Sequence, residues 1–325
     1  MSRGGKFFFF GLTFLLFFGG LLFVLGDFGK MHWLFDLVSH FQLQYFIFFL
    51  FCALVFWFAN YHARAVIALV FLLATFSNLI PYLPHYNYSA SRVSGVEKIE
   101  KKSPQVRVMF YNMYIANSRY EEIAEVIQVE KPDVLIITEI AQISYTNLEK
   151  LLADVYQYRY FETGFPDYFD MAIFSKLPIT NFQVHYLARE KNPTLDMTVK
   201  LGTKSLRVLS AHTRSPMGKD KTEIRNEHLT ALANIISGVD GALMVGGDFN
   251  ITPWSVYFKD FVKTSRLIDV RVGRGLLPSW ESRLLWSMRI PIDQVLVSRD
   301  VRVQNLHTGK AVGSDHLPMI LDVAM

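Results

Sequence analysis

The chain has 325 residues with a formal charge of +4, and 51% of its residues are hydrophobic. Eight of its 33 Lys and Arg residues and four of its 29 Asp and Glu residues precede Ser103, which leaves 25 of each sign beyond it. Duplex-binding enzymes usually carry a basic face, so this neutral balance makes nucleic acid a less favoured partner. The single cysteine, Cys52, excludes an intrachain disulfide and any thiol chemistry in the C-terminal part.

Three apolar segments occupy the first quarter of the chain. Residues 7–26, 41–60 and 65–83 consist mainly of Phe, Leu, Ile, Val and Ala. Each reaches the length of about 20 apolar residues that a membrane span needs, so we predict three transmembrane helices within residues 1–86. The first segment could alternatively be a signal peptide, although its apolar run is long and no small-x-small cleavage site follows Gly26.

Flanking charges predict the orientation of these helices. Arg3 and Lys6 precede the first helix and His62 and Arg64 follow the second, whereas the loop 27–40 carries two aspartates against one lysine. The positive-inside rule then places the N-terminus in the cytoplasm and everything after the third helix outside it. The sequence therefore predicts a multi-pass protein of the cytoplasmic membrane with an extracytoplasmic C-terminal domain.

The remainder of the chain is predicted to be a linker followed by one domain. Residues 87–104 mix Ser, Gly, Lys and Glu without hydrophobic periodicity, as linkers do. Strand and helix periods are both abundant in residues 105–325, which predicts a mixed α/β domain. The expected strands are 106–112, 133–138, 157–162, 170–175, 180–187, 195–201, 205–211, 242–247, 291–298, 301–307 and 318–324, and the expected helices are 119–129, 143–153, 220–237 and 255–263.

Two short strings near the C-terminus give the strongest functional signal. In GGDFN, residues 246–250, Asp248 and Asn250 flank Phe249 where an apolar strand ends, so strand alternation would put both polar side chains on one face. A carboxylate and an amide aimed at one point can activate water and hold a phosphoryl oxygen. In GSDH, residues 313–316, an acid and a titratable imidazole are neighbours.

Other polar residues occupy similar places at strand ends. Asn112, Glu139 and His212 each end an apolar strand, and Asp293 begins one. Polar side chains that gather at one rim of a sheet can build a site. Together with the two strings, these residues resemble the endonuclease/exonuclease/phosphatase family, which includes DNase I, apurinic endonucleases, inositol-polyphosphate phosphatases and neutral sphingomyelinases.

This resemblance extends from Gln105 to the C-terminus, and it implies a fold. In the family, two mixed β-sheets pack face to face with helices outside, which makes a four-layer, DNase I-like α/β sandwich. Some nucleases of the family carry an Asp two residues after the asparagine that ends the first strand. Tyr114 occupies that position here, which argues against an apurinic endonuclease.

The resemblance also implies a role for each residue. Mg²⁺, or Mn²⁺ in its place, would be held by hard oxygen donors from Glu139, Asn112 and Asp315. Water activation, phosphoryl binding and charge stabilisation would fall to His212, Asp248, Asn250, Asp293 and His316. Structural alternatives remain open, since a glutamate can begin a helix and Asn or Asp can simply form a turn.

Substrate contacts are expected from the variable loops. Segment 277–289 mixes aromatic, aliphatic and cationic side chains, which would suit a lipid head group or, equally, packing on the domain. The predicted substrate-binding residues are Arg214, Trp254 and Trp280. Because the linker keeps the domain near the bilayer, the predicted activity is hydrolysis of a phosphomonoester, phosphodiester or pyrophosphate in a lipid or lipid-linked substrate. A membrane-tethered endo- or exonuclease and a non-catalytic membrane scaffold with the same fold are the alternatives.

Overall fold

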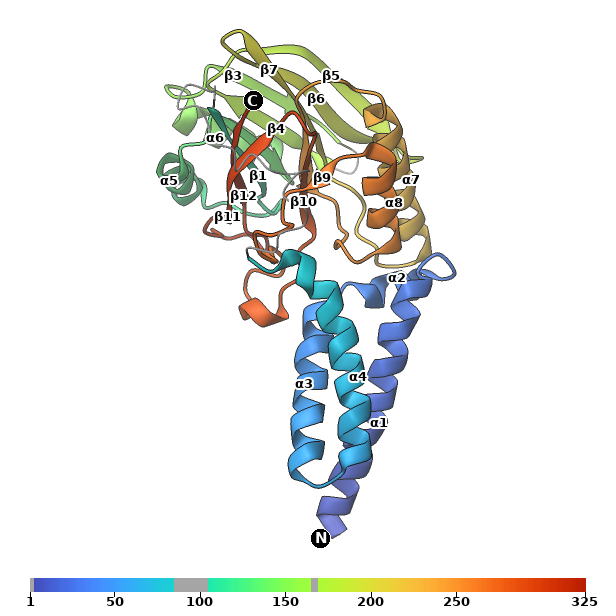
Figure 1. Ribbon diagram of the computed structural model, residues 1–325. Helices are drawn as coiled ribbons and strands as arrows, with labels where there is room; N and C mark the ends of the chain where they lie inside the picture. Colours follow the sequence, from blue (N-terminus) through green and yellow to red (C-terminus); the bar gives the residue numbers. More distant parts are fainter. Residues whose placement is uncertain (1–2, 85–104, 165–168) are drawn as a thin grey trace.

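A bundle of apolar helices carries an α/β domain at one end in the computed structural model of the protein (Figure 1). The structure describes residues 3–84, 105–164 and 169–325. The predicted linker, residues 87–104, lies outside the described residues. The N-terminus and the turn between α3 and α4 (Gln42–Phe58 and His62–Leu79) lie at the end of the bundle that is far from the domain.

The three predicted apolar helices are present, and a fourth, short helix joins them. α1 spans Arg3–Leu25 and, like α4, is long and apolar enough to cross a membrane. α3 meets the same test only together with α2 (Trp33–Ser39), from which it is bent by 68°. The sequence predicts a loop over residues 27–40, which is wrong for Trp33–Ser39, because seven residues are too few to show a clear helical period.

Two β-sheets form the centre of the domain. Their strands are β1 Gln105–Asn112, β2 Val134–Thr138, β3 Tyr158–Glu162, β4 Met171–Ser175, β5 Ile179–Leu187, β6 Asn192–Leu201, β7 Lys204–Ala211, β8 Leu243–Asp248, β9 Ile268–Asp269, β10 Asp293–Val297, β11 Arg302–Thr308 and β12 Met319–Ala324. One sheet has the order β11-β12-β1-β2-β4-β3 and the other the order β5-β6-β7-β8-β10-β9. β1 pairs with β2 and β7 with β8 in parallel, and the other neighbours pair antiparallel, so both sheets are mixed.

Helices cover the outer face of each sheet (Figure 1). Alternate side chains of β1 show how the layers pack: Val108 lies between the sheets, whereas Met109 faces the helices of its own sheet. The predicted four-layer, DNase I-like sandwich is therefore confirmed. The covering helices are α5 Tyr120–Glu130 and α6 Gln142–Leu152 on the first sheet, and α7 Lys219–Ile236 and α8 Val256–Ser265 on the second.

A buried ion pair joins the helical bundle to the domain. Asp36 on α2 and Arg225 on α7 are both inaccessible to solvent, and Nη2 of Arg225 lies 2.5 Å from Oδ2 of Asp36. The hydroxyl of Ser255 donates a hydrogen bond to the other carboxylate oxygen, at 2.5 Å. Nη1 of Arg225 donates to the backbone carbonyl of Asn250, at 3.3 Å, so the pair reaches the loop that follows β8.

Further contacts join the same rim of the domain to the helices. Nδ1 of His40 lies 2.8 Å from the hydroxyl of Thr252. The indole of Trp254 donates a hydrogen bond to the carbonyl of Asn78, at 3.1 Å, and packs in a cluster with Leu43 and Leu79. The loop after β8 therefore lies against the upper ends of the helices, and so does the loop before β10, where the carbonyl of Ser287 accepts a hydrogen bond from Gln44.

We expect Asp36→Ala to destabilise the protein by about 3–5 kcal/mol, because it leaves the Arg225 guanidinium buried without a counter-charge. Thermal unfolding of the full chain in lipid nanodiscs measures this. Asp36→Ala combined with Arg225→Met removes both charges and should recover most of the loss.

The matched control is Asp260→Ala, which breaks the exposed pair of Lys30 and Asp260 at 2.6 Å. Exposed pairs contribute little to stability, so its unfolding temperature should stay near that of the parent. Equal effects of Asp36→Ala and Asp260→Ala would contradict a structural role for the buried pair.

Candidate active site

Polar side chains from both sheets converge at the rim of the sandwich that faces the helices. They come from the ends of neighbouring strands, because the strands that carry them run toward the same edge or begin there. Asn112 ends β1, Glu139 follows β2, His212 follows β7, Asp248 ends β8, Asp293 begins β10 and His316 precedes β12.

One amide bridges the two sheets. Nδ2 of Asn112 donates to Oε1 of Glu139, at 2.8 Å, and to Oδ2 of Asp248, at 3.0 Å. Its own oxygen accepts from the backbone N–H of Tyr114, at 3.1 Å, which fixes the orientation of the amide. Asn112 therefore orients two carboxylates toward one point.

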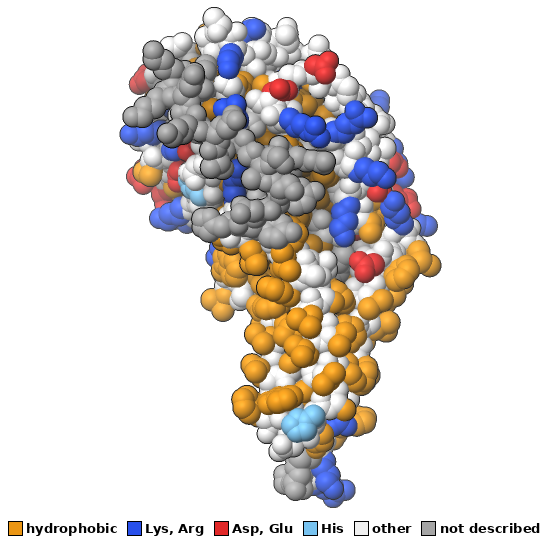
Figure 2. All heavy atoms as spheres, viewed as in Figure 1, with side chains coloured by type: hydrophobic (Ala, Val, Ile, Leu, Met, Phe, Trp, Pro, Cys, Tyr) orange, Lys and Arg blue, Asp and Glu red, His pale blue; other side chains and the backbone are white. Residues whose placement is uncertain are grey.

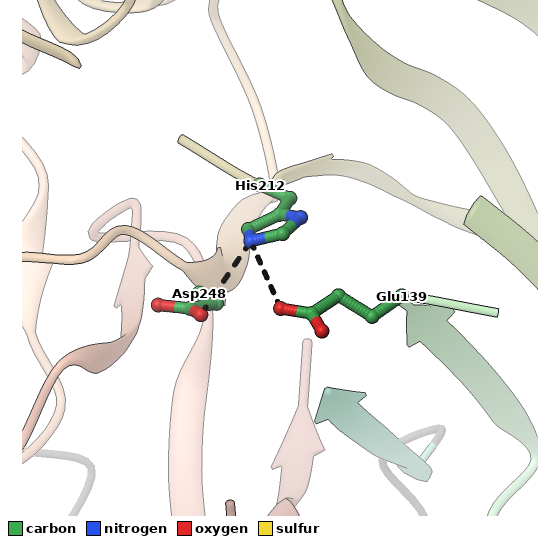
Figure 3. A group of neighbouring side chains, drawn as sticks. All are labelled: Glu139, His212 and Asp248. Atoms are coloured by element: carbon green, nitrogen blue, oxygen red, sulfur yellow. Dashed lines mark ion pairs between the residues drawn. The ribbon is translucent and has the colours of Figure 1, made fainter. Parts of the chain in front are cut away.

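His212 lies over the same two carboxylates (Figure 3). Its Nε2 is 3.5 Å from Oε1 of Glu139 and 3.6 Å from Oδ2 of Asp248. The ring packs near Phe169, with 5.0 Å between centroids. Burial lowers the pKa of His212, and the positive charge of His316 adds to this effect while Asp248 opposes it. His212 is therefore held in its neutral form at neutral pH.

His316 is in the opposite charge state. Its Nδ1 lies 2.9 Å from Oδ2 of Asp293, and its Nε2 lies 3.6 Å from Oδ2 of Asp248. Burial by itself would lower the pKa of His316, but the carboxylates of Asp293, Asp248 and Asp315 outweigh it and raise the pKa to about 10. The site therefore holds one imidazolium and one neutral imidazole, set apart by their carboxylate partners.

The carboxylates themselves are partly deprived of water. Burial raises the pKa of Asp248 to about 6, and it also raises the pKa of Glu139. The charge of Asp315 adds to the shift of Glu139, while the hydrogen bond from Asn112 opposes it. Glu139 also has a φ of 52°, a left-handed conformation that non-glycine residues rarely adopt and that clusters at functional sites.

This donor set fits a divalent cation. Oxygen and nitrogen atoms of Glu139, His212 and Asp248 lie within 4.8 Å of one another, and Asp315 is close enough for its charge to raise the pKa of Glu139. Buried carboxylates are costly unless paired, and hard cations prefer carboxylate oxygens. Of the three predicted ligands, Glu139 belongs to this cluster and Asp315 lies near it. Asn112 turns its amide nitrogen toward the carboxylates, so it would support the cation through its hydrogen bond to Glu139.

Two glycines allow the close approach of Asp248 to His212. A Cβ on Gly247, whose φ is 136°, would lie 2.2 Å from the carbonyl oxygen of Ala211, the residue before His212. A Cβ on Gly246 would lie 2.7 Å from the ring of Phe110 on the facing sheet. Larger residues at either position would push β8 away from the site.

Asn250 reaches the site in a different way from the sequence prediction. The predicted strand alternation stops at Asp248, and Asn250 has a left-handed φ of 48°. Its backbone N–H donates to Oδ1 of Asp248, at 2.9 Å, and its amide donates to the carbonyl of Thr213, also at 2.9 Å. Phe249 points into the core beneath α7 and α8, as expected.

The three predicted substrate-binding residues lie in different places. Trp280 is at the site, where its indole donates to Oδ2 of Asp315 at 3.1 Å. Arg214 lies two residues after His212 in the sequence. It pairs with Glu190 at 3.3 Å, and its guanidinium lies over the ring of Phe169.

Trp254 was predicted to wall the site, but the structure puts it elsewhere. Its ring is buried against the ends of α3 and α4, because the loop after Asn250 turns toward the helices. It anchors the domain rather than lining the cluster of Glu139, His212 and Asp248.

Sequence analysis did not identify the buried arginines that support the site. Arg225 lies three residues after Thr222 and four before Leu229 on the buried face of α7, so helical spacing is a signal that could have revealed it. Arg271 donates to Oε1 of Gln294, at 2.6 Å, and to the backbone carbonyl of Asp293. It lies in an irregular segment, where no periodicity marks it.

Comparison with known proteins bears on this site. The sequence model of the endonuclease/exonuclease/phosphatase family matches residues 109–316, which include all the converging polar residues. No curated protein sequence matches the chain.

Several solved structures share the fold. An endonuclease/exonuclease/phosphatase from Bacteroides vulgatus has a TM-score of 0.58 at 16% identity, over 68% of this chain and 99% of that one. TDP2 from D. rerio in complex with a single-strand DNA product gives 0.58 at 14%, over 68% and 99%. The catalytic domain of human Nocturnin with a bound sulfate gives 0.54 at 18%, over 68% and 95%. At these identities the likeness shows the fold.

We expect Asp293→Asn to lower the pKa of His316 by about 1–3 units, since it removes the adjacent negative charge. NMR titration of ¹³C-labelled histidine in the full chain measures the shift, with the His316 signal assigned by its absence in His316→Gln. Asp260→Asn, at an exposed position, is the matched control. An unchanged His316 titration would contradict the dyad.

The raised pKa of His316 also predicts a pH dependence of stability. The pKa of His316 in the folded state lies above the ordinary value of 6.5. Protonation therefore stabilises the fold fully below about pH 6.5, and this contribution is lost as the pH rises toward 10. In Asp293→Asn the loss should occur at lower pH.

Proposed function

The chain belongs to the endonuclease/exonuclease/phosphatase family, and we propose that it is a membrane-anchored, metal-dependent phosphoesterase. Members of the family are hydrolases that act on phosphoester bonds. One observation carries the proposal: carboxylates, an imidazolium and a neutral imidazole converge at the rim of the domain that contacts apolar helices.

Asp248 is the residue best placed to accept a proton from the attacking water. Its two oxygens are held by the backbone N–H of Asn250 and the amide of Asn112. With a pKa raised to about 6 it is mostly ionised at neutral pH, yet more basic than an ordinary aspartate.

The two histidines would bind the phosphoryl group with different charges. His316, kept protonated by Asp293, would stabilise the negative charge that develops on a phosphoryl oxygen. Neutral His212 directs its Nε2 toward the same point and would donate a hydrogen bond to a second oxygen (Figure 3). Asn250, in the loop beside Asp248, would help hold the phosphoryl group.

Glu139 and Asp315, with Asn112 beside Glu139, would hold Mg²⁺ or Mn²⁺. When bound, the cation would polarise a phosphoryl oxygen and offset negative charge there. Among the described residues, the surrounding carboxylates outnumber the single imidazolium, which favours a cation at this position.

A lipid or lipid-linked phosphate is the substrate class we propose. Figure 2 shows apolar side chains over the helical part of the molecule, with Lys and Arg at its far end and over the domain. The loops that contact the ends of α2, α3 and α4 are those that follow Asp248 and precede Asp293. A substrate held in the bilayer would therefore be close to the catalytic residues.

The second candidate is a membrane-tethered nuclease. It is favoured by the shared fold with D. rerio TDP2, which was determined with a single-strand DNA product. The equal number of acidic and basic residues beyond Ser103 favours the lipid substrate instead.

We expect the full chain in nanodiscs to release phosphate or head group from a phospholipid or a lipid pyrophosphate in the presence of Mg²⁺, and to stop when EDTA is added. Asp248→Ala should lower the rate by about 10²–10⁴-fold, because it removes the general base. Glu139→Ala should raise the Mg²⁺ concentration needed. Asp260→Ala is the control, and hydrolysis of short DNA without any lipid turnover would favour the nuclease.

We also propose that the domain lies outside the cytoplasmic membrane, with Arg3, Lys6, His62 and Arg64 inside. A reporter that works only in the periplasm should be active when fused after Met325, and a cytoplasm-only reporter should be silent. The reverse pattern would contradict this orientation and would favour soluble cytoplasmic phosphates as substrates.

A further inference from the structure

The loop before β10 exposes a run of large apolar side chains. Four of the five residues from Leu284 to Met288 are apolar and exposed: Leu284 is 45%, Leu285 78%, Trp286 54% and Met288 55% accessible. Single exposed apolar residues are ordinary on a protein surface, but a contiguous group of this kind marks an interaction site.

This loop lies directly beside the upper end of α3. Nε2 of Gln44, in the first turn of α3, donates to the carbonyls of Ser287, at 3.0 Å, and of Arg289, at 3.1 Å. The short helical turn η4 (Trp286–Met288) lies next to α3 in Figure 1. Further along α3 the exposed side chains are also apolar, among them Ile47, Phe51 and Leu54. The loop thus continues the apolar outer surface of α3.

Apolar residues at the start of α2 are exposed as well. Met31 and Leu34 belong to this group. Because α2 is bent by 68° from α3, it runs across the top of the bundle instead of continuing along it. The junction between helices and domain therefore exposes apolar side chains at α2 as well as beside α3.

The base of the loop is tied to the segment that carries the catalytic histidine. Trp280 forms backbone bridges with Ile290 and with His316. The backbone N–H of Ser282 donates to the carbonyl of Asp315, at 2.7 Å, and its hydroxyl donates to the carbonyl of Ser314, also at 2.7 Å. The tip of the loop, Leu284–Met288, is thus joined to the active site by a short, hydrogen-bonded segment.

We propose that Leu284–Met288 insert into the leaflet nearest the domain in the bilayer that surrounds α3, and that the active site therefore receives its substrate from the plane of the membrane. The flanking cations fit this position. Arg283 is 70% exposed and pairs with Glu281, and Nε of Arg289 donates to the carbonyl of Leu284, at 2.9 Å, so both guanidinium groups lie at the base of the apolar tip, at the depth of lipid phosphates. Insertion stands on the geometry alone, whereas its effect on lipid turnover rests on the proposed phosphoesterase function.

Site-directed spin labelling of the full chain in liposomes tests insertion. Cys52→Ala removes the single cysteine, and Leu285→Cys then places a label at the tip. We expect that label to collide with oxygen more than with a water-soluble nickel chelate, as a label at Phe51→Cys on α3 should. Val129→Cys is the matched control, because Val129 is apolar and 76% exposed but lies on α5, which is away from the helical bundle in Figure 1. A Leu285 label as open to nickel as the Val129 label would overturn the proposal, and a label shielded from both nickel and oxygen would indicate a protein contact in place of lipid.

A second measurement keeps the native cysteine. The difference in fluorescence between the parent and Trp286→Phe reports on Trp286 alone, and brominated lipids should quench it. Absence of quenching would overturn insertion independently of the labelled variants.

The functional consequence is tested with two substrates. Leu285→Glu should lower turnover of a lipid in vesicles about tenfold or more, the factor expected from losing one buried leucine side chain, and leave turnover of the water-soluble bis-p-nitrophenyl phosphate unchanged. Val129→Glu should change neither rate. Equal loss on both substrates would overturn the membrane role. If the parent hydrolyses neither substrate, the proposed function fails, and the depth measurements still decide insertion.

Discussion

The buried ion pair between Asp36 and Arg225 determines where the catalytic rim lies relative to the helices. Neither side chain reaches solvent, so water cannot replace either partner if the two parts separate. Arg225 also binds the carbonyl of Asn250, two residues after the proposed general base. The same guanidinium group therefore contacts both the helical bundle and the loop after Asp248.

The charge balance of the site follows from its burial. Asp248 lies within 3.6 Å of a nitrogen from each histidine, yet only His316 is positively charged, because Asp293 adds a second carboxylate on its other side. His212 has no such partner and stays neutral. Among the described residues, neither Glu139 nor Asp315 forms an ion pair with a Lys or Arg, which is the arrangement that a divalent cation would complete.

Much of this could be predicted from the sequence because the signals are local. Strand and helix periods identified the order of elements in the sandwich, and strings such as GGDFN marked where polar residues leave the strands. The sequence could not show α2, because the reason for its position is Arg225, which lies 189 residues away. It also placed Trp254 at the site, since the direction of a loop after a strand depends on tertiary contacts. The left-handed turn at Asn250 likewise goes with a tertiary contact, the hydrogen bond from its amide to the carbonyl of Thr213.

The exposed apolar loop would promote aggregation in water, and its location beside α3 accounts for its exposure. On a freely diffusing domain, Leu285 and Trp286 would favour aggregation. Beside the first turn of α3, which we propose to lie in a bilayer, the same side chains would be buried in lipid. The hydrogen bonds of Ser282 to Asp315 and Ser314 then connect the tip of the loop to the segment that carries His316. The proposed membrane contact is made by residues outside the catalytic cluster, so it would bring a lipid substrate to the site and leave the chemistry of His316 unchanged.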